Sequence, residues 1–317
     1  MSEVSKKVMQ AMLCMTRQCW EQGIAAQALM EAGEEELLAL VIHDMVLRQS
    51  SDGRLCNVEN TPAVTDSAFC VPAVLMTGNK TGSQRYKEAA EENISFFLKD
   101  AERAADGTLF HMRHTREIWA DSAAFLPYAL ALSGHFEEAF CQMKGILTRL
   151  CNEDTGLYCH IWDDGRRGYL REVSWGIGNG WILTGLLRTL LVWGREYQKE
   201  KQQMECWFYA LLENMLRFET KNHGFHDILD QPDTFEESEC AAMVAYVIYR
   251  AVFEGFLEEK YIMRADGIRE TLYEKIGSDG LVHRASGSPS FDRPGTSVEC
   301  QAHVMMMEQA YENVRIS

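Results

Sequence analysis

The sequence predicts an all-α protein whose helices form six hairpins closed into an (α/α)6 barrel. Three observations support this prediction. Helical periodicity runs along the whole chain, two kinds of helix alternate, and a short glycine-containing phrase recurs at intervals of about fifty residues. The chain has 317 residues, of which 46% are hydrophobic, and it has only six prolines and no linker rich in Ser and Gly. We therefore expect one domain that spans residues 1–317.

Apolar residues at helical spacing mark about twelve helical segments. Segments 135–151 and 198–219 are amphipathic, with one apolar stripe and charged residues opposite. Segments 118–133, 176–194 and 238–253 are apolar on nearly every side, so we expect them to be buried on every side. In order, the expected helices are 4–19, 21–32, 34–50, 62–77, 83–104, 118–133, 135–151, 174–194, 198–219, 237–255, 258–276 and 296–314.

A loop phrase in which glycine precedes apolar residues recurs between the helix pairs. Each glycine permits a tight turn with positive φ, and the apolar residues after it suggest a short extended piece. The competing architecture is an open helical solenoid, whose helices keep a solvated face. The helices that are apolar all round favour a closed ring instead. The phrases contain Gly53, Gly107, Gly156, Gly224 and Gly280, and four of them end at His111, His160, His226 and His283.

Composition excludes several classes of partner. The chain has 31 Lys and Arg against 47 Asp and Glu, a formal charge of −16, which argues against binding to nucleic acid or to an anionic membrane. No apolar stretch reaches transmembrane length, and the first residues do not resemble a signal peptide. The ten cysteines include no Cys-x-x-Cys pair, which indicates reduced core thiols. We expect a cytoplasmic protein. The sequence is compatible with a homodimer.

An Asp-Ser-Ala motif followed after three residues by Pro occurs twice, beginning at Asp66 and Asp121, an offset of 121 − 66 = 55 residues. If the apolar helices form an inner ring, both carboxylates face one mouth of the barrel. One can then stay ionised and raise the pKa of the other. Desolvation by Trp119 makes Asp121 the expected group with the raised pKa. The competing interpretation is that both residues are helix N-caps.

The stretch Ser174-Trp-Gly-Ile-Gly-Asn-Gly-Trp181 opens another apolar helix. Its tryptophans offer flat faces beside polar donors, a combination that suits a sugar ring, although two core tryptophans would give the same pattern. The histidines occur about one per loop phrase rather than in a ligand cluster. We therefore expect no metal, and we expect these histidines either to bind a substrate or to be structural.

At Trp119-Ala-Asp121 and Trp175-Gly-Ile-Gly-Asn-Gly-Trp181 the chain resembles the unsaturated glucuronyl and rhamnogalacturonyl hydrolases of glycoside hydrolase families 88 and 105. Those enzymes are (α/α)6 barrels with a Trp-x-Asp motif and a later Trp-Ala-Arg-Gly-Asn-x-Trp motif. The resemblance implies a six-hairpin glycosidase that acts on unsaturated uronic-acid oligosaccharides. It implies removal of a 4,5-unsaturated uronic acid from the non-reducing end of lyase-generated oligosaccharides. The acid protonates C4, water adds at C5, and no metal or organic cofactor takes part.

Carried over to this chain, the resemblance implies that Asp121 is the catalytic acid and Asp66 the second essential carboxylate. The family's arginine between the two tryptophans is Ile177 here. We expect an arginine in a mouth loop to replace its charge. The candidates are Arg113, Arg116, Arg166, Arg167 and Arg284. The resemblance also implies substrate-binding roles for His111, Trp119, His160, Trp175, Asn179 and Trp181.

Other functions remain open at this point. The same barrel hosts sugar epimerases and other carbohydrate enzymes, and an epimerase would use histidine pairs among His111, His160, His226 and His283 as acid and base. A degenerate family member would bind carbohydrate without turnover. A helical-repeat binding protein would present an exposed interaction face and no buried carboxylate pair.

Overall fold

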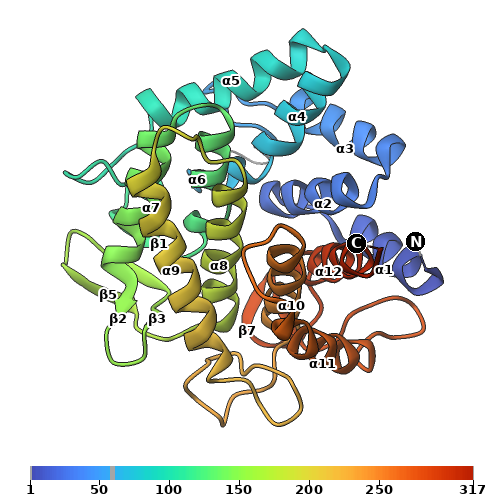
Figure 1. Cartoon of the computed structure of the whole chain (residues 1–317). Coiled ribbons are helices and arrows are strands. Elements are labelled where there is room, and N and C mark those ends of the chain that lie inside the picture. Colours follow the sequence, from blue (N-terminus) through green and yellow to red (C-terminus); the bar gives the residue numbers. More distant parts are fainter. Residues whose placement is uncertain (1, 58–60, 317) are drawn as a thin grey trace.

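The computed structural model describes residues 2–57 and 61–316, and in this part of the chain twelve α-helices form an inner and an outer layer (Figure 1). The predicted (α/α)6 barrel is confirmed. The inner helices are α2 (Cys19–Ala32), α4 (Val71–Thr81), α6 (Ser122–Leu132), α8 (Gly176–Leu191), α10 (Ser238–Phe253) and α12 (Val298–Ile316). The outer helices are α1 (Glu3–Met15), α3 (Glu35–Leu47), α5 (Gln84–Lys99), α7 (Phe136–Leu150), α9 (Gln198–Leu216) and α11 (Ile262–Tyr273).

The inner helices close into a ring. Each packs against the next along the chain, and the last, α12, packs against the first, α2. This contact distinguishes a barrel from an open solenoid. Five hairpins run from an inner helix to the outer helix that follows it. The sixth is made by the two ends of the chain, because α12 packs against α1, and Figure 1 shows the two termini side by side.

The two layers differ in burial as the sequence predicts. In the inner helix α8, every residue from Gly176 to Leu190 is buried. In the outer helix α9, buried residues recur at helical spacing along one stripe, for example Met204, Phe208 and Leu211. The inner helices approach one another closely, since a Cβ on Gly185 of α8 would lie 1.9 Å from the carbonyl oxygen of Ala123 in α6.

Short strands connect the helices at the ends of the hairpins, and one of them, directly after Gly156, is an extended piece of the kind that the loop phrases predict. Strand β1 (Glu117–Trp119) pairs with β4 (Ile161–Asp163), which pairs with β5 (Gly168–Arg171), all antiparallel. Two further pairs are β2 (Cys151–Asn152) with β3 (Leu157–Tyr158), and β6 (Ala285–Gly287) with β7 (Ser290–Gly295). The expected helix 118–133 is therefore wrong at its start: Ile118 pairs with Trp162 in the sheet, and α6 begins only at Ser122.

The expected helices 62–77 and 258–276 also begin later than predicted. A 3₁₀ turn, η2 (Asp66–Phe69), precedes α4, and another, η3 (Glu259–Tyr261), precedes α11. Four of the five phrase glycines have positive φ as expected, whereas Gly224 does not, and its neighbour His223 takes the left-handed conformation at φ 57°. Within the described residues, no helix combines the length and apolar character needed to cross a bilayer.

The close crossing of α6 and α8 generates a stability prediction. Gly185→Ala should lower the free energy of unfolding by about 1–3 kcal/mol, because the added methyl group meets backbone that cannot rotate away. Gly168→Ala is the control, since its Cβ would meet no atom within 4 Å. Chemical denaturation of both variants measures the difference. Equal stability of the two variants would show that the inner helices are not packed as described.

Candidate active site

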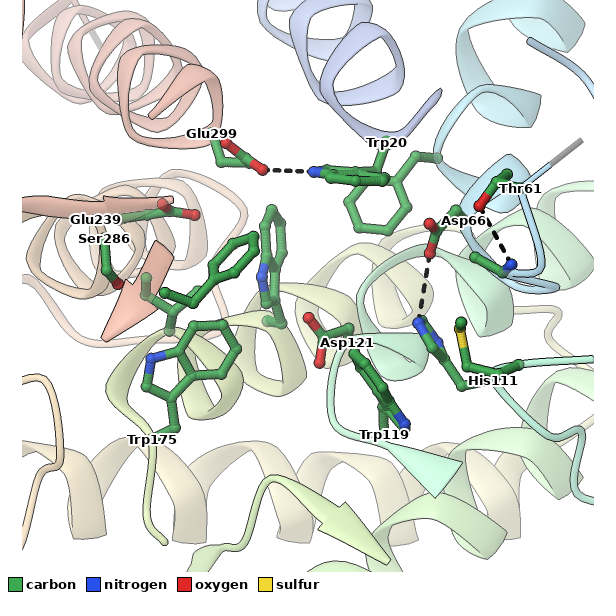
Figure 2. Close-up of a pocket in the computed structure, with 16 residues that line it drawn as sticks. Trp20, Thr61, Asp66, His111, Trp119, Asp121, Trp175, Glu239, Ser286 and Glu299 are labelled. Atoms are coloured by element: carbon green, nitrogen blue, oxygen red, sulfur yellow. Dashed lines mark hydrogen bonds and ion pairs between the residues drawn. The ribbon is translucent and has the colours of Figure 1, made fainter. Parts of the chain in front are cut away.

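A cavity of about 290 Å³ opens where the inner helices begin (Figure 2). All six inner helices contribute a wall residue from the N-terminal end of the helix or from the turn before it. Positive partial charge at a helix N-terminus stabilises nearby negative charge, so this end of the barrel favours anions. The wall contains four carboxyl groups, from Asp66, Asp121, Glu239 and Glu299, and four indole rings, from Trp20, Trp119, Trp175 and Trp181.

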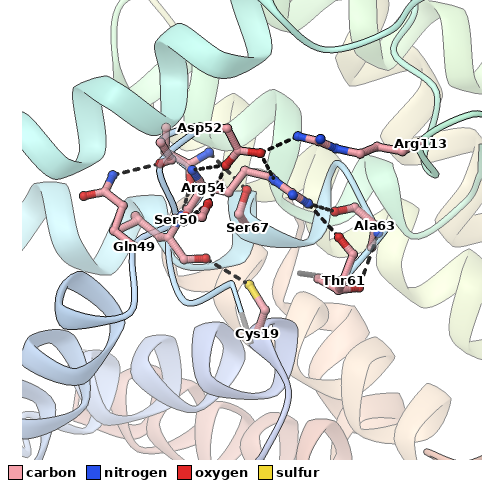
Figure 3. A network of polar contacts seen from close by, with 12 residues as sticks. Cys19, Gln49, Ser50, Asp52, Arg54, Thr61, Ala63, Ser67 and Arg113 are labelled. Atoms are coloured by element: carbon pink, nitrogen blue, oxygen red, sulfur yellow. Dashed lines mark hydrogen bonds and ion pairs between the residues drawn. The ribbon is translucent and has the colours of Figure 1, made fainter. Parts of the chain in front are cut away.

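Asp66 is the first residue of η2, and a buried arginine holds the loop before it (Figure 3). Arg54 donates hydrogen bonds through Nη1 to the carbonyl oxygens of Thr61, at 2.9 Å, and Ala63, at 2.7 Å. Its Nε donates to Oδ2 of Asp52 at 3.1 Å. The same carboxylate accepts a hydrogen bond from Arg113. These contacts fix the loop that places Asp66 at the cavity.

The pKa of Asp66 is raised from 3.8 to about 7, chiefly by burial and next by the charge of Asp121, with Arg54 opposing both effects. A carboxyl group with this pKa is still protonated in a large fraction of molecules at neutral pH. Asp66 therefore carries a proton that it can donate as a general acid.

Asp121 occupies the N-cap position of α6, but its side chain makes no capping hydrogen bond. The N-cap interpretation is therefore wrong for this side chain, which points into the cavity (Figure 2). Its Oδ2 lies 3.1 Å from Nε2 of His160. Burial acts to raise the pKa of Asp121, yet the hydrogen bond from His160 and the proximity of the two imidazoles, His160 and His111, outweigh burial and lower it. The expected order is thus reversed: Asp121 is the ionised member of the pair.

Arg171 on β5 determines which nitrogen of His160 carries the proton. Its Nη1 lies 2.7 Å from Nδ1 of His160, and because a guanidinium can only donate, Nδ1 must be the acceptor. The hydrogen then sits on Nε2, which donates it to Asp121. The guanidinium also lies 5.3 Å from the centre of the Trp175 ring, which holds it in place. Arg171, His160 and Asp121 form a directed chain of hydrogen bonds.

His111 lies on the other side of the pair. Its Nδ1 is 2.7 Å from Oγ1 of Thr65 and 3.0 Å from Oγ of Ser122, and its Nε2 is 3.6 Å from Oδ1 of Asp66. Its ring stacks on Trp119 with centroids 4.3 Å apart. Burial lowers the pKa of His111 to about 4, so the imidazole is neutral at neutral pH. A neutral ring can orient groups near Asp66 without adding charge.

The tryptophans of the wall are fixed by hydrogen bonds behind them or by ring contacts. Trp119 donates from Nε1 to Glu117 at 2.8 Å, and Trp175 donates to Asp227 at 3.2 Å. Trp181 makes an edge contact with Phe69, with centroids 5.3 Å apart. Rigid aromatic faces around convergent polar groups are typical of small-molecule sites.

Not every predicted site residue reaches the cavity. Asn179 is completely buried, and its amide is used by the backbone of Tyr158 and Trp175, so the predicted contact with substrate is wrong. His226 and His283 do not line the cavity, nor do any of the five arginines proposed to replace the family's arginine. Arg113, for example, is paired with Asp52 instead.

Sequence reasoning missed Trp20, Glu239, Glu299 and Phe291 in the wall, and Arg171 behind it. A signal for the two glutamates was present. Both lie in the first turn of an inner helix, as Asp121 lies just before one, but they lack the Asp-Ser-Ala duplication. Within the described residues, no group of three or more His, Cys, Asp or Glu side chains is arranged to hold a metal ion.

A family model described as Glycosyl Hydrolase Family 88 matches residues 1–307. The unsaturated rhamnogalacturonyl hydrolase YesR of Bacillus subtilis (strain 168) is 25% identical over 285 residues, covering 84% of this chain and 78% of YesR. A solved structure from Salmonella enterica serovar Paratyphi A, described as a possible member of family GH105, is similar with a TM-score of 0.86 and 17% identity, covering 99% of this chain and 93% of that one. An unsaturated glucuronyl hydrolase specific for heparin gives a TM-score of 0.75 at 12% identity, covering 99% of this chain and 96% of that one.

The Arg171 contact generates a prediction about the His160 tautomer. NMR of the ring nitrogens should find hydrogen on Nε2 and none on Nδ1 in the wild type. Arg171→Met removes the donor and should release this preference, whereas Arg167→Met, in the exposed turn of the same hairpin, should not. Wild-type protein with hydrogen on Nδ1 would contradict the assignment.

Proposed function

Since the chain belongs to glycosyl hydrolase family 88, we propose that it removes a 4,5-unsaturated uronic acid from the non-reducing end of lyase-generated oligosaccharides. We further propose that the barrel is a single catalytic domain, with Asp66 and Asp121 as its catalytic residues. The observation that carries the proposal is a pair of carboxyl groups in one aromatic cavity, with pKa values moved in opposite directions. Such a pair supplies an acid and a base at the same pH.

The proposed chemistry is hydration of the C4=C5 double bond rather than direct displacement at C1. Asp66 gives its proton to C4 while positive charge develops at C5. A water molecule adds its oxygen to C5 and transfers a proton to the Asp121 carboxylate. The product is a hemiketal at C5, which opens, and the aglycone leaves. One proton and one hydroxide have been added, and a proton passing from Asp121 back to Asp66 restores the starting state.

Around this pair, we assign the predicted residues that line the cavity to substrate binding, whereas His160 does not line it and acts through Asp121. Trp119, Trp175 and Trp181 offer faces for the sugar ring, His111 can contact it beside Asp66, and His160 keeps Asp121 ionised and oriented. A ring between rigid aromatic faces is held in one orientation with little loss of side-chain entropy.

The substrate's own carboxylate needs a partner in a cavity where Ile177 replaces the family's arginine. Among the described residues of the wall there is no Lys or Arg. Two features of this chain favour an anion there. The N-terminal ends of six inner helices converge on the cavity, and Asp66 and Glu299, each with a pKa of about 7, donate hydrogen bonds when protonated.

No observation favours an epimerase. His111 is neutral and tied to Thr65 and Ser122, while His160 is committed to Asp121 and Arg171. Neither ring is free to act as one of a histidine acid–base pair. His160 is held in one tautomer and donates its hydrogen bond to the Asp121 carboxylate. The hydration mechanism uses this arrangement.

Replacing either catalytic carboxylate should abolish most turnover. Asp121→Asn and Asp66→Asn should each lower kcat by about 10²–10⁴, because each substitution removes a proton-transfer group. The Asn side chain is nearly isosteric with the Asp side chain that it replaces. The assay follows the loss of ultraviolet absorbance of the conjugated double bond in an unsaturated uronyl disaccharide. Asp154→Asn, at an exposed position, is the control, and melting temperatures check folding. Either variant retaining more than about a tenth of wild-type kcat would exclude its residue from the chemistry.

The pH dependence should follow Asp66. Its pKa is raised from 3.8 to about 7, so the protonated acid is present below about pH 7 and lost above it. We expect kcat/KM to fall as the pH rises through this value. The native state holds this proton between about pH 4 and 7 while the unfolded state releases it, so stability should also fall as pH rises across that window. Asp66→Asn should make this loss of stability shallower. An unchanged slope would contradict the assignment.

A further inference from the structure

We propose that Thr65 and Ser122 are positioning residues for the proton donor. Their hydroxyl groups hold His111 in the tautomer that carries hydrogen on Nε2, and this N–H stabilises the negative charge that Asp66 acquires when it gives its proton to C4. The role given to Asp66 rests on the proposed function, whereas the tautomer is a property of the unliganded protein. Neither Thr65 nor Ser122 lines the cavity, so neither acts by touching the substrate.

The three groups form a closed triangle of buried polar atoms. Oγ1 of Thr65 lies 2.7 Å from Nδ1 of His111 and 3.0 Å from Oγ of Ser122, and this Oγ lies 3.0 Å from the same Nδ1. Thr65 is 2% exposed and Ser122 is 3% exposed. Among the described residues, neither hydroxyl has a hydrogen-bond partner outside the triangle. Both hydroxyl hydrogens must therefore find their acceptors inside it.

The supply of acceptors in the triangle determines which nitrogen of His111 carries hydrogen. If Nδ1 is an acceptor, Thr65 can donate to it and Ser122 can donate to Thr65, so both hydroxyl hydrogens are used. If Nδ1 carries hydrogen, only the two hydroxyl oxygens remain as acceptors. Two hydroxyls cannot donate to each other at the same time, so one buried O–H would have no acceptor, which is unfavourable. Because burial lowers the pKa of His111 to about 4, the ring is neutral and its single hydrogen is on Nε2.

The position of Thr65 in the chain supports a dedicated role for its hydroxyl. Thr65 is the N-cap residue of η2, where a threonine side chain commonly accepts a hydrogen bond from the turn, yet it makes no capping hydrogen bond here. It directly precedes Asp66, and Ser122 directly follows Asp121. The contact between the two hydroxyls joins residues 57 positions apart in the sequence. It therefore also fixes the segments that carry the two catalytic carboxyl groups relative to each other.

The Nε2 atom of His111 faces the proton donor. It lies 3.6 Å from Oδ1 of Asp66, and Figure 2 shows the ring directed at this carboxyl group. This distance is longer than a hydrogen bond. When the O–H bond of Asp66 breaks and its hydrogen joins C4, the electron pair stays on the carboxyl group, and the N–H can close on the new carboxylate. Catalytic hydrogen bonds commonly tighten in this way as charge develops.

His160 has the same arrangement at the other catalytic carboxyl group. Its Nδ1 accepts from Arg171, and its Nε2 donates to Asp121. The two rings differ in what supports them, because a guanidinium lies behind His160 and two neutral hydroxyls lie behind His111. A charged donor polarises the ring and strengthens its N–H as a donor, which favours an ionised Asp121. The neutral support of His111 leaves the neighbouring acid able to hold its proton until the transfer.

The first test is the tautomer of His111, measured by NMR of the ring nitrogens in the unliganded protein. Wild-type protein should carry hydrogen on Nε2 and none on Nδ1. Either hydroxyl alone can donate to Nδ1, so Thr65→Val and Ser122→Ala should each keep this tautomer. The double variant Thr65→Val/Ser122→Ala has no donor left and should show both tautomers. The matched double variant Thr65→Ser/Ser122→Ala keeps one hydroxyl and should show hydrogen on Nε2 alone.

The second test compares turnover of an unsaturated uronyl disaccharide by the two double variants. The variant without a hydroxyl should have a kcat about threefold to tenfold lower than the variant with one, the range expected for the net contribution of one hydrogen bond. KM should be similar in both, because neither hydroxyl touches the substrate. A role confined to folding would instead lower the melting temperature and kcat of both double variants alike and leave the tautomer unchanged.

Hydrogen on Nδ1 in wild-type protein overturns the inference without any variant. An unchanged tautomer after both hydroxyls are removed, or equal kcat in two double variants whose tautomers differ, also overturns it. If a double variant does not fold, the wild-type tautomer decides. The proposed function is tested separately by turnover in wild-type protein. Hydrogen on Nε2 without any turnover would refute the proposed function and the role given to Asp66, while the tautomer assignment would stand.

Discussion

The site depends on how the protein tolerates four carboxyl groups in one largely apolar cavity. An isolated buried carboxylate is unfavourable, and no Lys or Arg of the described wall neutralises Asp66, Asp121, Glu239 or Glu299. The structure meets this constraint in two ways. Asp66, Glu239 and Glu299 have raised pKa values, so they hold protons at higher pH. Asp121 alone has a lowered pKa, because His160 donates to it. The separation of acid from base follows from this one hydrogen bond.

That hydrogen bond depends in turn on contacts between segments far apart in the sequence. Asp121 directly precedes α6, His160 precedes β4, and Arg171 ends β5, so the small sheet that joins β1, β4 and β5 brings the three side chains together. On the opposite side, Arg54 fixes the loop before Asp66. The closed ring then fixes these loops relative to one another, because the contact of α12 with α2 leaves no free end of the barrel. Rigid positioning of this kind is what proton transfer at a defined carbon requires.

Much of the fold was predictable because the apolar pattern of a helix shows which of its sides are buried. The inner helix α8 is apolar on every side, and the outer helix α9 is apolar on one side. The Asp66 and Asp121 pair was predictable because the motif is duplicated. Strand β1 was not predictable, since three residues are too few to show the alternation of a strand and Ile118 fits a helical pattern equally well. The pKa order was reversed because it depends on His160, 39 positions from Asp121 in the sequence. Asn179 looked like a ligand contact, yet its amide closes a backbone loop that sequence alone does not show.

The central claim is that one proton resides on Asp66 while Asp121 stays ionised. The most direct test is an NMR titration of the carboxyl carbons of both residues in the unliganded protein, assigned with Asp66→Asn and Asp121→Asn. The account predicts that the Asp66 carbon titrates at about pH 7 and that the Asp121 carbon remains that of a carboxylate to below its ordinary pKa of 3.8. A neutral Asp121 beside an ionised Asp66 at neutral pH would contradict the account and return the acid role to Asp121.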